Sequence, residues 1–224
     1  MTFSIIARCP RSGQFGIGAA TAMPAVGKLL SHAAAGYGAV ATQAQINPYL
    51  GLDGLRLLCE GHTAEEALAL LQGTDPCMTL RQVALIDANA RTACWTGDDC
   101  LPWAGSRQGE GYSVQGNRLA GKHVIDAVAN AFLDRAEQPL IERLLEAVAA
   151  GDATGGDRHG ESSATLYVVD QEAYPLWDIR VDQHLDPVTE LRRLHDVFAR
   201  EVVPEILRMP TRANPAGKHG EDQV

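Results

Sequence analysis

The sequence has few lysines and no cluster of basic residues. Its 224 residues carry 19 Lys and Arg against 28 Asp and Glu, which gives a formal net charge of −9. Proteins that bind the phosphates of DNA or RNA gather Lys and Arg on one face. Lysine occurs here only at Lys28, Lys122 and Lys218, so we expect no nucleic-acid partner.

Long apolar runs and an export signal are also missing. No stretch approaches the roughly 18 consecutive apolar residues that span a bilayer. The first residues lack a basic segment followed by an apolar segment and a small-residue cleavage site. We therefore expect a cytoplasmic protein with no membrane partner.

The five cysteines have neither the spacing of a redox pair nor that of a metal site. No two of them form C-x-x-C, and no Cys/His set stands at zinc-ligand spacing, Cys94 and Cys100 included. In a cytoplasmic chain such cysteines are reduced thiols. We expect no metal and no cofactor.

What is present is a series of strand and turn signals that predicts antiparallel hairpins. Turn residues at 10–13 and 88–90 separate neighbouring apolar segments. Gly16 and Gly18, inside the second segment, indicate that another layer packs closely there. Strands are predicted at residues 2–9, 14–23, 39–45, 81–87, 91–96, 111–116, 164–170 and 177–182.

Helix pairs separate these blocks of strands. Thr63 and Glu66 have capping-box spacing. Helices are predicted at 51–60, 63–72, 124–132 and 140–148, and after Asp186-Pro187. Hairpins in blocks do not make a doubly wound parallel sheet. We predict an α+β fold, a four-layer αββα sandwich of two stacked antiparallel sheets with outer helices. It forms a single domain over residues 1–209, with a disordered tail at 210–224.

Four stretches, taken in their order and spacing, resemble one bacterial family. They are MTFSI at 1–5, GAVATQA at 38–44 with Asn47-Pro48, QGN at 115–117 with Leu119-Ala120, and GGDR at 155–158 with Gly160, Ser163 and Ala164. They resemble the domain-of-unknown-function 1028 family over residues 1–186. The resemblance implies the sandwich of N-terminal-nucleophile (Ntn) hydrolases and names no substrate. His159 and Ser162 depart from the family pattern, which has Arg and Gln there.

Thr2 is the candidate nucleophile that this resemblance implies. Ntn chemistry uses a Ser, Thr or Cys at the mature N-terminus, and the α-amine acts as base. The reference pKa of that amine, about 7.7–8.0, leaves part of it unprotonated near neutrality. Removal of Met1 would expose Thr2. If Met1 stays, the acylated amine is no base, and Thr2 is an ordinary strand residue. Neither Thr21 nor Lys28 matches the acid and lysine that better-described Ntn enzymes place beside their threonine.

Thr42, Gln43 and Asn117 are candidate oxyanion donors. Thr42 and Gln43 end a predicted strand just before the turn at Asn47-Pro48, and Asn117 follows a glycine ahead of a predicted helix. Hydroxyl, amide or backbone N–H groups in such places can stabilise the negative charge of a transition state. The alternative is local: Thr42 and Gln43 cap a turn, and Asn117 caps a helix.

The glycine-rich loop at 155–160 is the candidate substrate-binding segment. Gly155 and Gly156 let backbone N–H groups approach an anion. Arg158 would hold a carboxylate through two hydrogen bonds, Asp157 would orient it, and His159 could titrate near neutrality. The alternative is an Asp157–Arg158 ion pair that fixes a tight turn or a subunit contact.

Together these residues predict an Ntn-type amidohydrolase acting on a small amide-containing metabolite, and a carboxylate on that metabolite would bind Arg158. A second interpretation is a non-catalytic Ntn-like protein that keeps Met1 and binds a ligand or forms an oligomer. A third gives the chemistry to Asp157 with His159. The apolar richness of the chain, with Trp95 and Trp103 as core or interface anchors, predicts a homo-oligomer.

Overall fold

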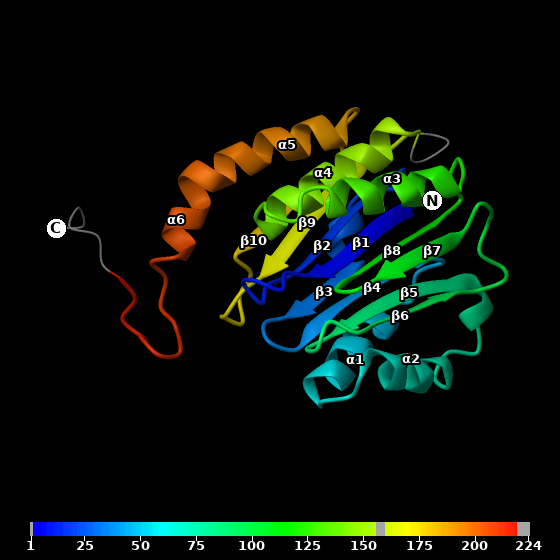
Figure 1. The fold of residues 1–224 in the computed structure, drawn as a ribbon, viewed down its shortest axis with the longest axis horizontal. Helices are drawn as coiled ribbons and strands as arrows, with labels where there is room; N and C mark the ends of the chain where they lie inside the picture. The colour runs from blue at the N-terminus through cyan, green and yellow to red at the C-terminus, as the bar shows by residue number, and fades with distance from the viewer. Residues whose placement is uncertain (1, 156–159, 219–224) are drawn as a thin grey trace.

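Two antiparallel sheets lie face to face in the structure, a computed structural model that describes residues 2–155 and 160–218 (Figure 1). In spatial order the first sheet holds β10 (Trp177–Val181), β9 (Ser163–Val169), β2 (Phe15–Thr21), β1 (Thr2–Arg8), β8 (Tyr112–Asn117) and β7 (Gly105–Gly109). The second holds β3 (Ser31–Ala34), β4 (Gly38–Ala44), β5 (Arg81–Asp87) and β6 (Thr92–Thr96).

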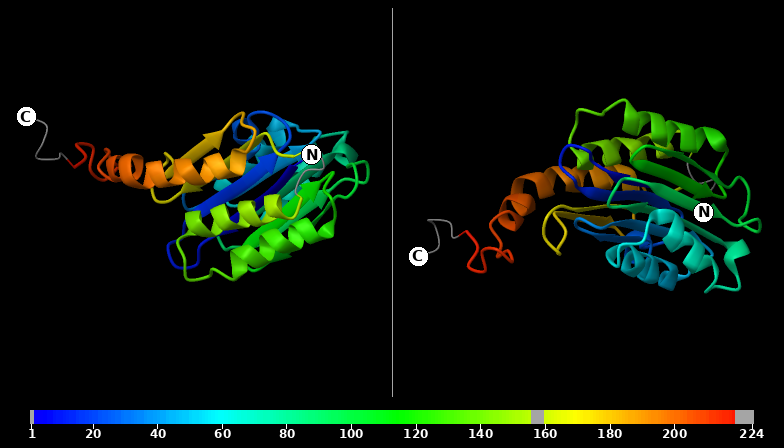
Figure 2. Two further views of the ribbon diagram at one scale, coloured as in Figure 1. Left: turned by 90° about the horizontal axis from the view of Figure 1, so that it is seen from above. Right: turned by 60° about the horizontal axis from the view of Figure 1, so that its bottom comes forward.

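Helices cover the outer face of each sheet. The first sheet is covered by α3 (Lys122–Leu133), α4 (Leu140–Ala153) and α5 (Pro187–Val197), and the second by α1 (Pro48–Cys59) and α2 (Ala64–Gln72). Short helical turns η1 (Val26–Lys28) and η2 (Met78–Leu80) precede β3 and β5. The segment η3 (Phe198–Val202) continues α5 into α6 (Val203–Ile206), which reaches beyond the sheets (Figure 2). The predicted αββα sandwich is confirmed.

Alternation of side chains along the strands builds the layers. On β1, Phe3 and Ile5 face the helices α3 and α4, whereas Ile6 faces the opposite sheet. All three are at most 1% exposed. Because both faces of this strand are buried, its sequence reads as an almost unbroken apolar run.

The close packing predicted at Gly16 and Gly18 is confirmed. A Cβ atom at Gly16 would lie 2.5 Å from Cδ1 of Leu144, and one at Gly18 would lie 2.9 Å from Cγ2 of Val148. Both partners belong to α4. The missing side chains of β2 therefore let this helix approach the sheet closely.

The structure differs from the sequence-based expectation at three elements. The strands β3 and β7 were not predicted. Asn117 is the last residue of β8, and α3 begins after Gly121, so Asn117 is not a helix cap. The capping box at Thr63 and Glu66 is confirmed, with both of its hydrogen bonds present.

Candidate functional site

Thr2 lies in a polar row that crosses one end of the first sheet. In the antiparallel ladders it stands opposite Thr21 of β2 and Asn117 of β8. Residues directly opposite each other place their side chains on the same face. The amide of Asn117 donates to Oε1 of Gln82, on the other sheet, over 3.1 Å. This face therefore points between the sheets. The hydroxyl oxygens of Thr2 and Thr21 are 3.0 Å apart.

A second polar row lies one step further into the sandwich. Ser4 of β1 stands opposite Gln115 of β8, and the Gln115 amide donates to Oγ of Ser4 over 2.7 Å. Ser4 in turn donates to Oε1 of Gln43, on the second sheet, over 2.7 Å. Ser113 donates to Oε1 of Gln115 over 2.9 Å. The hydroxyl of Ser4 therefore connects amides of both sheets.

Gln82 is the centre of the polar side chains that the second sheet contributes. Its Oε1 accepts from the Gln43 amide over 2.7 Å, as well as from Asn117. Its own amide donates to Oγ1 of Thr96 over 2.8 Å and to the carbonyl oxygen of Gly116 over 2.9 Å. Buried polar groups are costly without hydrogen bonds. Here the hydrogen bonds of the two rows satisfy them with neutral hydroxyls and amides.

A cleft of about 270 Å³ opens beside these rows. Its polar wall consists of Thr2, Thr21, Thr42 and Gln43, and its apolar wall consists of residues between positions 23 and 30 together with Ala44 and Ile46. A second cleft, of about 350 Å³, shares Ala44 and includes Asn117, Asp99 and Arg118. Thr2 is partly exposed, so a molecule in the first cleft can reach its hydroxyl.

Three non-glycine residues that line these clefts have left-handed backbones. They are Ala25 (φ 61°), Ala44 (φ 70°) and Arg118 (φ 57°). Such conformations cost of order 1–3 kcal/mol and gather at binding and catalytic sites. Their position around the two clefts supports a functional role for this end of the sandwich.

The candidate residues of the sequence have different outcomes. Thr2, Gln43 and Asn117 come together at this end of the sandwich. Thr42 lies next to them in β4 and lines the cleft, but its hydroxyl donates to the carbonyl oxygen of Asn47 over 3.3 Å. This bond agrees with the turn-capping alternative for Thr42. Lys28 lies exposed in η1.

The glycine-rich loop is described only in part. Gly155 has φ 88°, as a turn glycine does, whereas Met1, Gly156, Asp157, Arg158 and His159 lie outside the described residues. Ser162, just after the loop, donates its backbone N–H to the carbonyl oxygen of Thr21 over 2.8 Å and its hydroxyl to that of Ala22 over 2.7 Å. This flank of the loop is therefore anchored beside the polar row.

Sequence reasoning missed Gln82, Gln115, Ser113 and Thr96, and rejected Thr21 as a catalytic acid without recognising it as the partner of Thr2. One signal was available. Ser113, Gln115 and Asn117 recur every second residue in a short strand, which places three polar side chains on one face. Because the strand is fully buried, that pattern indicates a polar layer inside the sandwich.

The cysteines near the site are poor nucleophiles. Burial raises the pKa of the Cys94 thiol to about 11, and it also raises the pKa of Cys100, which lines the second cleft. Both therefore stay protonated near neutrality, whereas the thiolate is the reactive form.

The described residues hold no cluster of three or more His, Cys, Asp or Glu placed to bind a metal ion. Within the same residues, no helix has the length and apolar character to cross a membrane.

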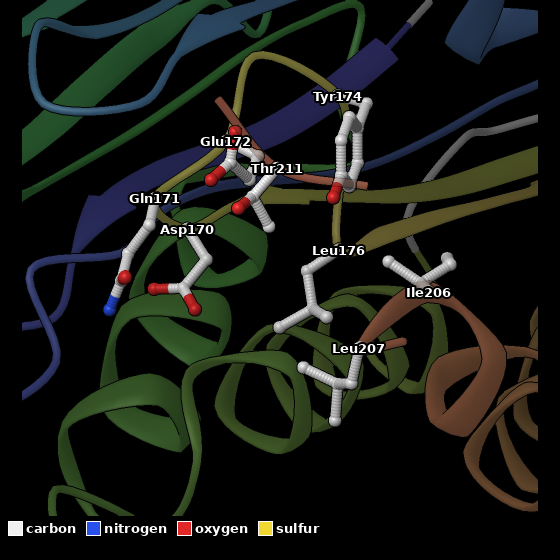
Figure 3. Close-up of a pocket in the computed structure, with 8 residues that line it drawn as sticks. All are labelled: Asp170, Gln171, Glu172, Tyr174, Leu176, Ile206, Leu207 and Thr211. Atoms are coloured by element: carbon white, nitrogen blue, oxygen red, sulfur yellow. The ribbon is translucent and has the colours of Figure 1, made fainter. Parts of the chain in front are cut away.

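Another cleft, of about 200 Å³, lies at the opposite end of the first sheet. It is formed between the connection that follows β9 and the C-terminal segment, and Figure 3 shows Leu176 and Leu207 between Asp170 on one side and Ile206 on the other. Val169, at the end of β9, pairs with Phe15, whereas Thr21 pairs with Ser163 at the other end of the ladder. This cleft is therefore separate from the polar rows.

Comparisons with known proteins identify relatives by family and by structure. The model of a family described as a family of unknown function, DUF1028, matches residues 2–191. The crystal structure of protein SPO2555 from Silicibacter pomeroyi, which carries the same family model, has a TM-score of 0.89 at 26% identity, covering 98% of this chain and 99% of that chain. Anbu (ancestral beta-subunit) from Yersinia bercovieri has a TM-score of 0.42 at 15% identity, covering 88% and 97%. No curated protein matches the chain.

Proposed function

This chain belongs to the DUF1028 family, and from the geometry around the start of β1 we propose that it is an N-terminal-nucleophile amidohydrolase acting on a small amide-containing metabolite. Thr2, freed by removal of Met1, attacks the amide carbonyl carbon. Its α-amine accepts the hydroxyl proton and passes it to the leaving amine as the C–N bond breaks. Water then hydrolyses the ester on Thr2 and releases the acid.

One observation carries this proposal: Thr2 is partly exposed beside a cleft of about 270 Å³, at the start of a central strand. The Thr21 hydroxyl, 3.0 Å away, can fix the rotamer of the Thr2 hydroxyl. The described side chains of the two polar rows are neutral amides and hydroxyls. The α-amine is therefore the group near Thr2 that is suited to act as base at neutral pH.

Asn117 is the strongest of the candidate oxyanion donors. It stands opposite Thr2, and its hydrogen bond to Gln82 fixes the orientation of its amide. The amide of Gln43 already donates to Gln82 and, over 3.4 Å, to the carbonyl oxygen of Gln115. Gln43 therefore serves mainly to hold the wall of the cleft. Thr42 contributes to the same wall.

The glycine-rich loop belongs to the proposal as a substrate-positioning segment. The position of the loop's flanking residues, Gly155 and Ser162, supports this role, because Ser162 donates hydrogen bonds to the carbonyl oxygens of Thr21 and Ala22. We propose that Asp157 and Arg158 position the substrate and that His159 also contributes to binding it. Arginine and a glycine-rich backbone favour an anionic group wherever the substrate carries one.

The first measurement is the intact mass of the full-length native protein. We expect a chain that begins at Thr2 with a free amine. Turnover of a panel of small amides and lactams should then fall by about a thousandfold or more in Thr2→Ala, because the nucleophile is gone. Thr2→Ser, which restores a hydroxyl, should recover part of the rate. A retained or blocked Met1 contradicts the mechanism.

The non-catalytic interpretation keeps one supporting observation. The hydroxyls of Thr2 and Thr21 bond to each other, and Thr21 stands where an acid could otherwise tune the amine. A protein with Met1 retained that binds amides without hydrolysing them would favour this ligand-binding or oligomer-forming role. Full turnover in Thr2→Ala would instead favour the chemistry of Asp157 with His159.

A further inference from the structure

We infer that the cleft beside Thr2 takes an uncharged, apolar acyl group, so that the substrates are amides of short aliphatic acids. This inference rests on the proposed function, because it uses Thr2 to define which end of the cleft receives the carbonyl carbon. It concerns the chemistry of the acyl group and not the identity of the nucleophile.

The lining of the cleft carries the argument. None of the described residues that line it is Asp, Glu, Lys or Arg. Met23, Leu29 and Ile46 belong to this lining and are 65%, 42% and 38% exposed. Large apolar side chains that solvent reaches in one cleft are typical of a site for an apolar ligand. A carboxylate placed there would lose hydration without gaining a counter-charge from these residues.

Hydrogen bonds to the neighbouring segments hold the backbone of the apolar wall. The hydroxyl of Ser163 in β9 donates to the carbonyl oxygen of Met23 over 2.6 Å and accepts from the backbone N–H of Val26 over 3.0 Å. The N–H of Ala25 donates to the carbonyl oxygen of Asp182 over 2.8 Å. Because these bonds fix the backbone of the wall, a ligand pays little to order it.

The volume of the cleft, and the difference between its lining and that of the second cleft, restrict which ligands fit. A volume of about 270 Å³ lies just below the usual range for pockets that hold drug-sized ligands, which favours a short acyl chain. The second cleft, which shares Ala44, instead has Asp99 and Arg118 in its lining. Among the described lining residues, charge is therefore available in the second cleft, and the first cleft fits the apolar acyl chain.

The test measures binding to full-length Thr2→Ala protein, which holds the ligand without turning it over. The probes are butanamide, pentanamide, hexanamide and adipamate, in which a carboxylate replaces the terminal methyl group of hexanamide. Isothermal titration calorimetry gives each dissociation constant. We expect binding to strengthen up to about fourfold for each added methylene, and adipamate to bind at least about tenfold more weakly than hexanamide.

A matched pair of variants locates the site. Leu29→Asp puts a charge on the apolar wall and should weaken hexanamide binding by about tenfold. Leu70→Asp makes the same change on an exposed residue of α2, 48% exposed and outside the lining, and should leave binding unchanged. The thermal midpoints of both variants check that they fold, and the chain-length series tests the inference without either variant.

Four results would overturn the inference. Adipamate binding as tightly as hexanamide would place a cation in the acyl site, as expected if Arg158 reaches it. Failure of hexanamide to bind, or equal binding by Leu29→Asp, would remove the apolar site. A change of sedimentation coefficient in Leu29→Asp would show that a second copy covers the wall. None of these outcomes tests whether Thr2 is the nucleophile. The intact mass of the native protein and the turnover of Thr2→Ala test that separately.

Discussion

At the scale of single residues, Asp75 stabilises the turn that follows β4. Its carboxylate accepts from the Asn47 amide over 2.8 Å, from Nε of Arg81 over 2.9 Å and from the backbone N–H of Cys77 over 2.8 Å. Arg81 also donates to the carbonyl oxygen of Gln45. Ile46, between Gln45 and Asn47, lines the cleft beside Thr2. The carboxylate therefore supports one edge of the candidate site.

These contacts predict a pH dependence of stability. Burial alone would raise the pKa of Asp75, but hydrogen bonds from Asn47 and Arg81 outweigh burial and lower the pKa to about 2. The unfolded value is about 3.9. A lowered folded pKa gives stability that is fully present above about pH 4 and is lost as pH falls toward 2. Urea unfolding of the native protein from pH 5 to pH 2 should show this loss.

The variant to compare with the native protein is Asp75→Asn, which keeps the shape of the side chain but removes its charge. We expect this variant to be less stable at pH 7 by about 2–3 kcal/mol, because charge-assisted bonds are lost. Its stability should change less between pH 4 and pH 2 than that of the native protein. Parallel curves for the two proteins would show that Asp75 is not the group responsible.

Individual residues also show how much of the site can be predicted from the sequence. Thr2 and Asn117 were identified from motifs, and the structure places them opposite each other. Gln115 stands in the same motif as Asn117 and Gln82 in none of the four, but neither was assigned a role, because their roles depend on which strands of the two sheets face each other. No local pattern encodes that pairing. The direction of the Thr42 hydroxyl depends on side-chain alternation along β4, so one residue of register decides it.

At the scale of elements, the strands that sequence analysis missed are edge strands. β3 and β7 each pair with one neighbour only and end their sheets. Neither contains a fully buried residue. Their sequences, SHAA and GSRQG, are short and poor in β-branched and aromatic residues. Pairing with β4 and β8 supplies the strand geometry that their own propensity does not.

The approach of α4 to β2 gives a prediction at this scale. Gly16→Ala would place its Cβ 2.5 Å from Leu144 and 3.1 Å from Leu140 and Val168. We expect an overpacking cost of about 1–3 kcal/mol, measured by urea unfolding. Gly73→Ala is the control, since its nearest atom would be 3.4 Å away and its φ is −76°. Equal stability of the two variants would mean that α4 shifts to accommodate the added methyl group with no loss in the free energy of unfolding.

At the scale of the whole molecule, the four layers could be predicted but the strand order could not. β1 pairs with β8 across more than a hundred residues, as Thr2 and Asn117 show, and β2 pairs similarly with β9. Sequence patterns reveal layers through burial, whereas long-range pairing depends on packing of the complete chain. The predicted homo-oligomer stays a prediction. Trp95 and Trp103, on which it was based, both pack against cores of their own chain.

The arrangement of the layers predicts how stability is distributed. β1 lies between β2 and β8, and its residues Phe3, Ile5 and Ile6 are at most 1% exposed. The segment from α6 to the described end at position 218 reaches beyond the sheets (Figure 2) and is mostly exposed. Strand amides in such a core exchange only through large-scale unfolding, whereas exposed terminal segments open locally.

Hydrogen–deuterium exchange with peptide mapping tests this distribution. Peptides from β1 should exchange most slowly, and peptides from 207–224 should exchange fastest, which also tests the disordered tail predicted at 210–224. Peptides from α2, an outer helix of the second sheet, serve as the internal comparison. If β1 exchanged as fast as α2, the central strand would not be the stable element. Thr2 would then lack the rigid support that positioning a nucleophile requires.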